Sequence, residues 1–279
     1  MTALRGDALE VWGDPIEHSR SPDLHAAAYA VLDVPWSYGR RQVSVATFDR
    51  EFGALDPSFR GLSLTYPLKG LAFEASVVRD RRAELTGAVN TLLIGADGGP
   101  RGFNTDVGGI VRDLGEHDLA GLDRARIVGA GATATSALVA LAEIGARRVE
   151  VAARRPDAVA PLVPLGESLG VAVVAVPLAD AVHAPVPLTI ATLPGGAPVS
   201  APVADALAAA GGVLYDVVYG QWPTPLAAAW ERAGHRAVKG IGMLLHQAVL
   251  QVRIFAAGDA EAELAHEDAV LAAMRSAVM

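Results

Sequence analysis

The hydrophobic positions of this chain form short runs of strand length that alternate with helical patterns, most regularly in the second half. In the second half the apolar runs cover residues 126–128, 149–151, 171–176, 188–192 and 212–218. Between the first two of these runs, apolar residues keep a helical spacing from about Thr133 to Ile144, and the helical pattern ends at Gly145. Such alternation predicts a doubly wound α/β sheet, in which ligands bind at the carboxyl ends of the strands.

The first half of the chain and its C-terminal part contain further predicted strands and helices. Ser21 stands in the N-cap position of a helix, with Pro22 at its first helical position. The other expected elements of the chain are strands at 8–13, 61–66 and 87–94, a helix from Pro22 to about Leu32, a helix from Val107 to Leu114, a long apolar helix after Gly240, and an amphipathic helix from about Glu261 to Met274.

A glycine-rich turn joins the strand at 126–128 to the helix that follows it. Its residues, Gly129-Ala130-Gly131-Ala132-Thr133-Ala134, spell G-x-G-x-x-A. In a βαβ unit the first glycine makes the tight turn, the second admits a pyrophosphate, and the third small residue lets the helix pack on the strand. The phosphates would bind the free N–H groups at the positive end of the helix. The turn predicts a dinucleotide site, with a plain packing turn as the alternative.

The end of the next strand bears on the choice of cofactor. An NAD site places Asp or Glu there, about 20 residues beyond the glycines, to bind the ribose hydroxyls. This chain has Ala152-Ala153-Arg154-Arg155, and Arg154 lies 25 residues after Gly129 (154 − 129). Because guanidinium groups suit a 2′-phosphate better than a bare ribose, we predict NADP. Asp157 leaves NAD open, and a pair of solvated arginines is the alternative without a ligand.

Composition narrows the classes of function. The chain has 279 residues, of which 52% are hydrophobic and 19% charged, so two globular domains are expected. A net charge of −8 argues against a nucleic-acid or membrane partner, and without cysteine there is no thiolate metal site, so no metal is expected. The N-terminus lacks a signal-peptide pattern, and no run reaches the roughly 20 apolar residues of a membrane span. We expect a cytoplasmic protein.

Two hydroxyl groups lie close together just before the first helix. Ser19 and Ser21 are spaced i and i+2 and are candidates for binding a carboxylate or a hydroxyl group. Capping would explain Ser21 without a ligand, but it does not explain Ser19. His18 and His25 have no other potential metal ligands beside them in the sequence, and we interpret both as structural residues.

Lysine is rare in this chain, and one of its lysines follows a strand end. Only Lys69 and Lys239 are lysines among the 23 basic residues. Ser63 and Thr65 share one face of the preceding strand, and Lys69 follows the proline that ends it. A lysine can release its proton when burial or neighbours lower its pKa, whereas arginine cannot. Lys69 is therefore a proton-transfer candidate, against the alternative of an ordinary surface charge.

Further polar residues interrupt apolar stretches. Asn90 lies in an otherwise apolar strand pattern, and Asn104 and Asp106 precede a helix. Asp106 could simply cap that helix, and Asn104 could form a local turn. Gln247 lies on the apolar helix after Gly240, where it is either satisfied within the core or directed at a ligand.

Taken together, these pieces resemble the shikimate dehydrogenase family along the whole chain. The matching motifs, in order, are Ser19-Arg20-Ser21-Pro22, Thr65-x-Pro67-x-Lys69, Ala88-Val89-Asn90-Thr91, Asn104-Thr105-Asp106, the Gly129 turn, Tyr215-Asp216-x-x-Tyr219, Thr224-Pro225-Leu226 and Gly242-Met243-Leu244-x-x-Gln247-Ala248. The resemblance implies reversible, NADPH-dependent reduction of 3-dehydroshikimate to shikimate on the route to aromatic amino acids. We expect a monomer or a homodimer, and the sequence does not distinguish the two.

The resemblance also implies the domain plan and the roles of residues. It implies a substrate domain of residues 1–106 completed by 241–279, a Rossmann-like NADP domain of residues 107–240, and an active site in the cleft between them. Lys69 and Asp106 would form the catalytic pair. Ser19, Ser21 and Tyr219 would hold the substrate carboxylate, and Ser63, Thr65, Asn90 and Gln247 the ring oxygens. The cofactor would contact Gly129, Ala130, Gly131, Ala132, Thr133, Ala153, Arg154, Arg155, Thr192, Val217 and Gly240.

The chain departs from the family pattern in three places. Ser63 stands where the family often has Asn, Ala153-Arg154-Arg155 where it often has Asn-Arg-Thr, and Ile190-Ala191-Thr192-Leu193 where it usually has Asn-Ala-Thr-Ser. The change at Ser63 keeps quinate or an amino-substituted shikimate open as substrates. A folate-type dehydrogenase shares the two-domain plan but does not need the serine pair, and a catalytically silent NADP-binding regulator would not need Lys69 and Asp106.

Overall fold

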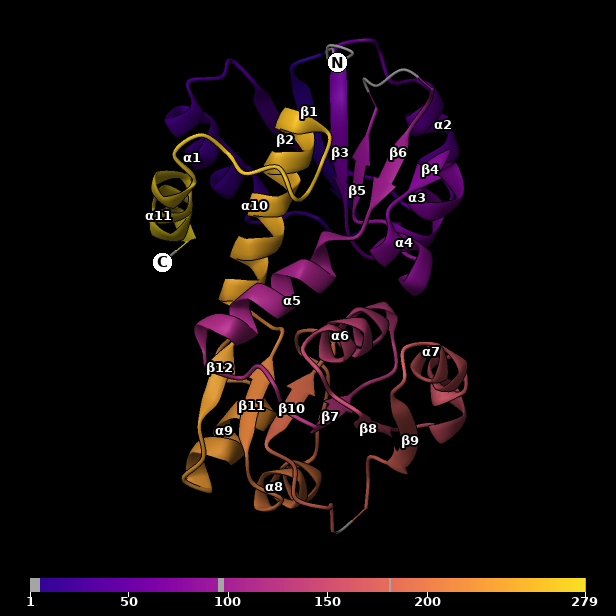
Figure 1. The fold of residues 1–279 in the computed structure, drawn as a ribbon, viewed down its shortest axis with the longest axis vertical. Coiled ribbons are helices and arrows are strands. Elements are labelled where there is room, and N and C mark those ends of the chain that lie inside the picture. Colours follow the sequence, from indigo (N-terminus) through magenta and orange to yellow (C-terminus); the bar gives the residue numbers. More distant parts are fainter. Residues whose placement is uncertain (1–5, 95–97, 181, 279) are drawn as a thin grey trace. The chain divides into compact units, whose positions relative to one another are not determined.

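The computed structural model describes residues 6–94, 98–180 and 182–278. Its contacts divide the chain into two units, one formed by the chain up to Gly109 together with the stretch from Leu245 onward, the other by Ile110–Leu244 (Figure 1). The divisions fall inside two helices, α5 (Thr105–Glu116) and α10 (Ile241–Ala257). Each unit is built on its own six-stranded sheet.

The first unit contains a mixed sheet with the strand order β2-β1-β3-β5-β6-β4. Strand β1 is parallel to both of its neighbours, whereas β5 is antiparallel to β3 and to β6. The strands are β1 (Ala8–Gly13), β2 (Ser37–Gln42), β3 (Phe59–Leu64), β4 (Val78–Arg79), β5 (Thr91–Leu93) and β6 (Arg101–Phe103).

Helices cover both faces of this sheet. Figure 1 shows α1, α10 and α11 on one face and α2, α3 and α4 on the other. Besides α10, these helices are α1 (Ser21–Leu32), α2 (Phe48–Gly53), α3 (Lys69–Ala75), α4 (Arg81–Thr86) and α11 (Glu267–Val278).

The alternation of β3 decides which of its residues face which helices. Leu62 and Leu64 enter an apolar core with Trp12 and Phe48. Gly61 and Ser63, which alternate with these leucines, point the other way, toward α10, since side chains of a strand alternate between its faces. A Cβ at Gly61 would lie 2.5 Å from the ring of Phe255, so this position needs glycine. Ser63 faces α10 in the same way.

Three expectations at helix starts are wrong. Arg20, not Ser21, is the N-cap of α1, and Ser21 is its buried first residue. The capping alternative for Asp106 is wrong because Asp106 lies inside α5. The side chain of Asn104 instead accepts hydrogen bonds from the N–H groups of Asp106 and Val107.

The last helix begins at Glu267 and not near Glu261. The reason is the left-handed backbone of His266, whose φ of 56° interrupts any helix that crosses it.

The second unit contains the predicted doubly wound sheet, and all six of its strands are parallel. The strand order is β12-β11-β10-β7-β8-β9, so the chain builds outward from β7 in one direction and then from β10 in the other. The strands are β7 (Arg124–Val128), β8 (Arg148–Ala153), β9 (Ala172–Pro177), β10 (Leu188–Ala191), β11 (Val213–Asp216) and β12 (Ala237–Lys239). Ligands of such sheets bind at the carboxyl ends of the two strands where the order reverses, here β7 and β10.

The crossover helices lie on both faces of this parallel sheet. Figure 1 shows α6 (Ala132–Glu143) and α7 (Leu162–Ser168) on one face and α8 (Ala201–Ala209) and α9 (Pro225–Arg232) on the other. A short 3-10 helix, Pro156–Val159, follows β8. Within the described ranges, no helix has both the length and the apolar character that crossing a membrane requires.

Candidate active site

The glycine turn lies at the point where the strand order of the second unit reverses. Gly129 directly follows β7 with a φ of 111°, a conformation that suits glycine. A Cβ added there would lie 2.7 Å from the Thr192 hydroxyl oxygen. The backbone N–H and the hydroxyl group of Thr192 both donate to the Val128 carbonyl, at 2.9 and 3.0 Å. The turn after β7 and the end of β10 therefore form one packed surface.

The first turn of α6 presents backbone N–H groups that no side chain caps. Gly131 is the N-cap residue, so no side chain caps the helix, and Gly131 and Ala132 are exposed. A Cβ built on Gly131 meets no atom within 4 Å. By contrast, Ala134 is fully buried and packs the helix on the sheet. Open N–H groups at a helix N-terminus form an anion site, and this geometry fits a pyrophosphate.

Two arginines follow the end of β8. Ala153 is buried, whereas Arg154 and Arg155 are exposed. Within the part of the chain that the structure describes, neither guanidinium group has a hydrogen bond or ion pair to a protein group. Asp157 lies in the 3-10 helix that follows. The two guanidinium groups are thus available to a dianionic phosphate, which they fit as bidentate donors.

The remaining predicted cofactor residues follow the last strands of the sheet. Val217 comes directly after β11, and its N–H donates to the Ala191 carbonyl at 3.0 Å. Gly240 comes directly after β12, and a Cβ there would overlap the backbone of Val217. Tyr219 lies half-buried in the loop after β11. Val217 and Gly240 therefore offer backbone groups at this edge of the sheet.

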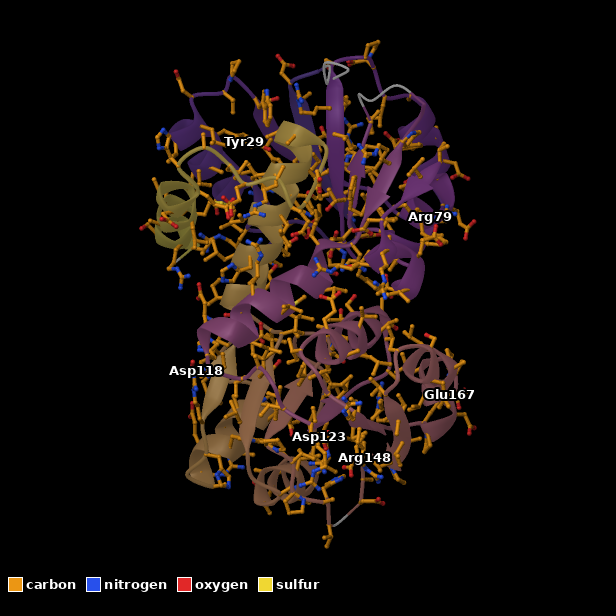
Figure 2. The ribbon with its side chains drawn as sticks, viewed as in Figure 1. Tyr29, Arg79, Asp118, Asp123, Arg148 and Glu167 are labelled. Carbon is orange, nitrogen blue, oxygen red and sulfur yellow. The ribbon has the colours of Figure 1, made fainter. Side chains whose placement is uncertain are left out.

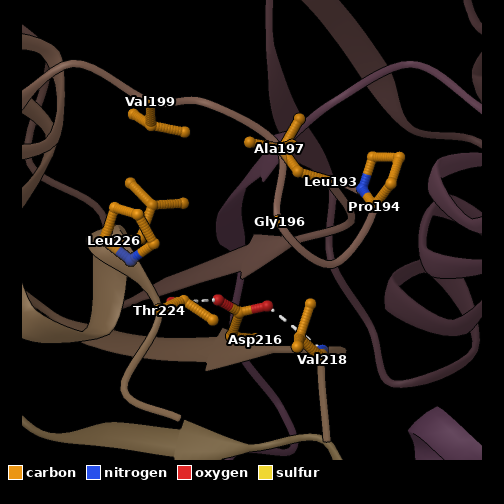
Figure 3. A pocket seen from close by; sticks show the side chains of 10 residues that line it. Leu193, Pro194, Gly196, Ala197, Val199, Asp216, Val218, Thr224 and Leu226 are labelled. Carbon is orange, nitrogen blue, oxygen red and sulfur yellow. Dashed lines mark hydrogen bonds between the residues drawn. The ribbon is translucent and has the colours of Figure 1, made fainter. Parts of the chain in front are cut away.

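A pocket beside this edge contains a buried carboxylate. Asp216 accepts hydrogen bonds from the Val218 N–H at 3.1 Å and from the Thr224 hydroxyl at 2.7 Å (Figure 3). Burial raises the pKa of Asp216, and these two hydrogen bonds act in the opposite direction. The pocket is lined by Leu193, Pro194, Gly196, Ala197, Val199, Asp216, Val218, Thr224, Pro225 and Leu226. Asp216 thereby ties together both ends of the loop that carries Tyr219.

In the first unit, the two predicted catalytic side chains meet. The Lys69 Nζ donates to the Asp106 Oδ2 at 2.5 Å, and the two side chains are 18% and 8% exposed. Lys69 is the first residue of α3, and Asp106 lies in the first turn of α5. The pair is mostly shielded from water, which strengthens its interaction, yet the lysine keeps some access to a ligand.

Asn90 fixes the other oxygen of this carboxylate. Its amide Nδ2 donates to the Asp106 Oδ1 at 2.7 Å and to the Thr105 hydroxyl at 2.9 Å. Its Oδ1 accepts from the Thr105 N–H and from the Thr91 hydroxyl, each at 2.9 Å. Both donors and both acceptor positions of the amide are therefore engaged with protein groups. Asn90 acts here as a support for Asp106.

Ser63 belongs to a buried network that the sequence did not indicate. The Tyr38 hydroxyl donates to the Ser63 Oγ at 2.6 Å and also shares a hydrogen bond with Ser21. The Ser63 hydroxyl in turn donates to the Gln251 Oε1 at 3.0 Å. Gln251 lies four residues after Gln247, on the same side of α10, and this spacing is the signal that could have identified it.

The other predicted ligands of the first unit lie around this network. Ser19 and Ser21 are neighbours in space, and the Ser21 N–H donates to the Ser19 Oγ at 3.3 Å. Thr65 follows the end of β3, where its methyl group leaves no space for a side chain at Gly13. Gln247 is buried near the start of α10. Each has a hydroxyl or amide group within the unit that holds Lys69.

His25 occupies the core, as expected. It is fully buried, stacks on Tyr38 at 3.9 Å between ring centroids, and bonds to Tyr29 through Nδ1 at 2.9 Å. Figure 2 shows Tyr29 on α1. His18 is exposed. Neither histidine is among the described side chains that lie close enough together to hold a metal ion.

The fold and the two groups of residues define a class of protein, a two-domain α/β protein with a dinucleotide-binding sheet and a separate lysine–carboxylate pair. Residues 11–92 match the family model of the shikimate dehydrogenase substrate binding domain. The chain is 41% identical to the NADP(+) shikimate dehydrogenase of Methylobacterium radiotolerans, over 86% of this chain and 87% of that protein. It is 38% identical to that of Alkalilimnicola ehrlichii, over 87% and 90%. The chain belongs to the shikimate dehydrogenase family.

Solved structures agree with this assignment. The crystal structure of Mycobacterium tuberculosis shikimate dehydrogenase superposes with a TM-score of 0.84 at 40% identity, over 97% of this chain and 99% of that chain. The shikimate 5-dehydrogenase of Thermus thermophilus, in complex with NADP(H) and shikimate, gives a TM-score of 0.78 at 28% identity, over 97% and 99%. The predicted two-domain α/β fold is confirmed by these similarities.

Proposed function

We propose that this protein catalyses the reversible reduction of 3-dehydroshikimate to shikimate with NADPH. The observation that carries the proposal is the Lys69–Asp106 pair, with 2.5 Å between Nζ and Oδ2 and with the second carboxylate oxygen bound to Asn90. Relatives named NADP(+) shikimate dehydrogenases, to which the chain is about 40% identical, support it.

The residues of the second unit fit NADP. The open N–H groups of the α6 first turn, beside Gly129 and Gly131, would hold the pyrophosphate. Arg154 and Arg155 would hold the 2′-phosphate, and Thr192, Val217 and Gly240 would contact the rest of the molecule. When bound, the cofactor supplies the hydride.

Lys69 supplies the proton in this proposal. Reduction of a carbonyl carbon leaves an alkoxide, which takes a proton from the ammonium group of Lys69. Asp106 holds the Nζ in place, and Asn90 prevents the carboxylate from rotating. In the oxidative direction the same lysine, as the neutral amine, accepts the proton of the substrate hydroxyl. A correctly positioned acid of this kind contributes roughly 10²- to 10⁴-fold in rate.

The hydroxyl and amide groups of the first unit orient the substrate. Ser19 and Ser21, together with Tyr219, bind the carboxylate, and Ser63, Thr65 and Gln247 bind ring oxygens. Asn90 contributes to ring binding mainly through Asp106, because its own amide is saturated by protein groups.

The test measures reduction of NADP⁺ by the absorbance of NADPH, with shikimate, quinate and aminoshikimate offered in parallel. We expect the highest kcat/KM for shikimate. A higher kcat/KM with quinate or aminoshikimate would show that the preferred substrate is that compound, and the protein would still be an NADP-dependent dehydrogenase. Absence of turnover with all three, in protein that binds NADP⁺, would favour a silent NADP-binding regulator.

We propose further that the enzyme acts as a monomer or a homodimer in the cytoplasm. Light scattering of the purified protein distinguishes the two assemblies, and cell fractionation tests the compartment.

A further inference from the structure

Gln251 connects the buried network around Ser63 with the hydrogen bonds around Asn90. Its amide is buried, with a residue exposure of 2%, and it lies on α10 among groups from β3, α1 and the start of β5. The Oε1 accepts from the Ser63 hydroxyl at 3.0 Å and bonds to the His25 Nε2 at 3.2 Å. The Nε2 donates to the Thr91 hydroxyl at 3.1 Å and to the Asn90 carbonyl at 3.3 Å.

The partners of Gln251 determine which way its amide faces. A backbone carbonyl can only accept a hydrogen bond, so the group beside the Asn90 carbonyl must be the NH₂ of Gln251. The oxygen of the amide then faces Ser63 and His25. Both of these must donate to it, so His25 carries its proton on Nε2 while Nδ1 accepts from Tyr29. Burial lowers the pKa of His25 to about 3 and keeps the ring neutral.

This orientation of the amide determines whether the Ser63 hydroxyl donates or accepts each of its hydrogen bonds. A serine hydroxyl has one proton, which goes to Gln251, and two lone pairs, one of which accepts from Tyr38. One lone pair remains for a ligand. Ser63 can therefore meet a ring substituent only as an acceptor, so that the substituent must bring its own proton.

The other half of the amide extends toward the catalytic pair. From the Gln251 Nε2 the hydrogen bonds continue through the Thr91 hydroxyl to the Asn90 Oδ1, and from the Asn90 Nδ2 to the Asp106 Oδ1. Thr91 has one proton as well, and because it accepts from Gln251 it donates to Asn90. Gln251 thus stabilises the orientation of the amide that holds Asp106.

We propose that Gln251 is a positioning and specificity-determining residue, which makes Ser63 a pure hydrogen-bond acceptor for a substrate hydroxyl or amino group and holds Asn90 in place beneath Asp106. The proposal rests on the proposed function, because it concerns how the proposed active site recognises its substrate. Its substrate class is a ring whose substituent at Ser63 carries a proton, and it disfavours a carbonyl or an ether at that place.

The test separates the two halves of the amide by kinetics. Ser63→Ala removes the substrate acceptor and should raise the KM for shikimate roughly 3- to 10-fold, the range for one neutral hydrogen bond, at nearly unchanged kcat. Thr91→Val removes the link to Asn90 and should lower kcat by a similar factor. Gln251→Met, of similar volume, should do both, and none of the three should alter the KM for NADP⁺.

A double-mutant cycle and a matched control exclude a merely structural effect. The KM of the Gln251→Met, Ser63→Ala double variant should equal that of Ser63→Ala, because groups acting through one another are not additive. Val252→Ala changes the neighbouring, fully buried apolar residue of α10 and should lower thermal stability without a shift in KM for shikimate. Multiplicative effects in the cycle, or a Gln251→Met variant whose kinetics match Val252→Ala, would overturn the proposal.

A measurement on the unmodified protein covers the case in which Gln251→Met does not fold. Nitrogen-15 NMR of the histidine rings, with His25 assigned by His25→Gln, should show a neutral ring protonated at Nε2. A proton on Nδ1 would reverse the amide and refute the proposal. If the wild-type protein fails to oxidise shikimate, it is the proposed function that fails, and the tautomer of His25 still tests the network.

Discussion

Lys69 and Asp106 lie 37 positions apart in the sequence, and their side chains meet at 2.5 Å. Each is placed by the start of a helix, Lys69 by α3 and Asp106 by α5. The Lys69 carbonyl also accepts the N–H of Val89, next to Asn90, at 3.0 Å. The side chains of Lys69, Asp106 and Asn90 are thus held by one another, and a backbone hydrogen bond ties the Lys69 position to the strand that follows Asn90.

Lys69→Ala should lower the turnover number by at least about 10²-fold while changing substrate affinity much less, because an acid used only in the transition state contributes to kcat. Lys69→Arg should not restore turnover, since guanidinium keeps the charge but does not release a proton. Steady-state kinetics of both variants with shikimate check this. Turnover near the wild-type value in the arginine variant would show that positive charge alone is sufficient.

The buried imidazole of His25 should make stability fall in acid. Its pKa is about 3 in the folded protein, against the ordinary imidazole pKa of 6.5, so between these values the unfolded chain binds a proton that the folded protein does not. Stability is therefore lost as the pH falls below 6.5, by up to about 1.4 kcal/mol per pH unit. Urea unfolding at a series of pH values should show a steeper decline for wild type than for His25→Gln. Parallel declines would mean that His25 is protonated in the fold.

At the scale of elements, the cofactor residues of the second unit are presented by strand ends and by a helix N-terminus. The turn after β7 leaves the first N–H groups of α6 open, and the end of β8 carries Arg154 and Arg155. In the proposed site, backbone donors would bind the pyrophosphate that NAD and NADP share, and the arginines would bind the one group in which the two differ. The proposal thus divides affinity and cofactor choice between two elements.

Replacement of Arg154 and Arg155 together by Ala should raise the KM for NADPH sharply and leave the use of NADH almost unchanged. Each charge-assisted hydrogen bond to the 2′-phosphate contributes roughly 1.5 to 3 kcal/mol, and NADH lacks that phosphate. Initial rates with both cofactors, at saturating 3-dehydroshikimate, measure the ratio. Equal losses with NADPH and NADH would remove the 2′-phosphate from these arginines.

At the scale of the whole molecule, the predicted substrate and cofactor residues belong mainly to different units. Ser19, Ser21 and Lys69 lie in the first unit, and Gly131 and Arg154 in the second. Each unit has its own sheet and its own core. A change in the binding groups of one unit should therefore leave binding by the other intact.

Ser19→Ala combined with Ser21→Ala should weaken binding of shikimate by more than about 10-fold, because each hydrogen bond to a charged group contributes roughly 1.5 to 3 kcal/mol. Binding of NADP⁺, measured separately by calorimetry, should not change. A folded double variant with unchanged affinity for shikimate would place the carboxylate at other residues.

Local patterns in the sequence were sufficient for the parallel sheet of the second unit, its glycine turn and its arginine pair. These features depend on neighbours within about one βαβ unit, where strand runs, glycine positions and helical spacing are decided by short-range sterics and hydrogen bonding. Lys69 was a proton-transfer candidate from its scarcity and its place after a strand end, whereas the role predicted for Asp106 came from the resemblance to the shikimate dehydrogenase family.

Only the tertiary structure decided which distant polar groups meet. Ser63 and Gln251 are 188 positions apart, and their contact requires that α10 cover the face of β3 opposite to its leucines. The tertiary structure also decided that Thr91, Thr105 and Asp106 use all the hydrogen-bonding positions of the Asn90 amide. It likewise decided the left-handed backbone of His266, after which the last helix begins. A side chain's sequence neighbours determine its local conformation, but the direction of a buried hydrogen bond is set by the packing of elements that are remote in the chain.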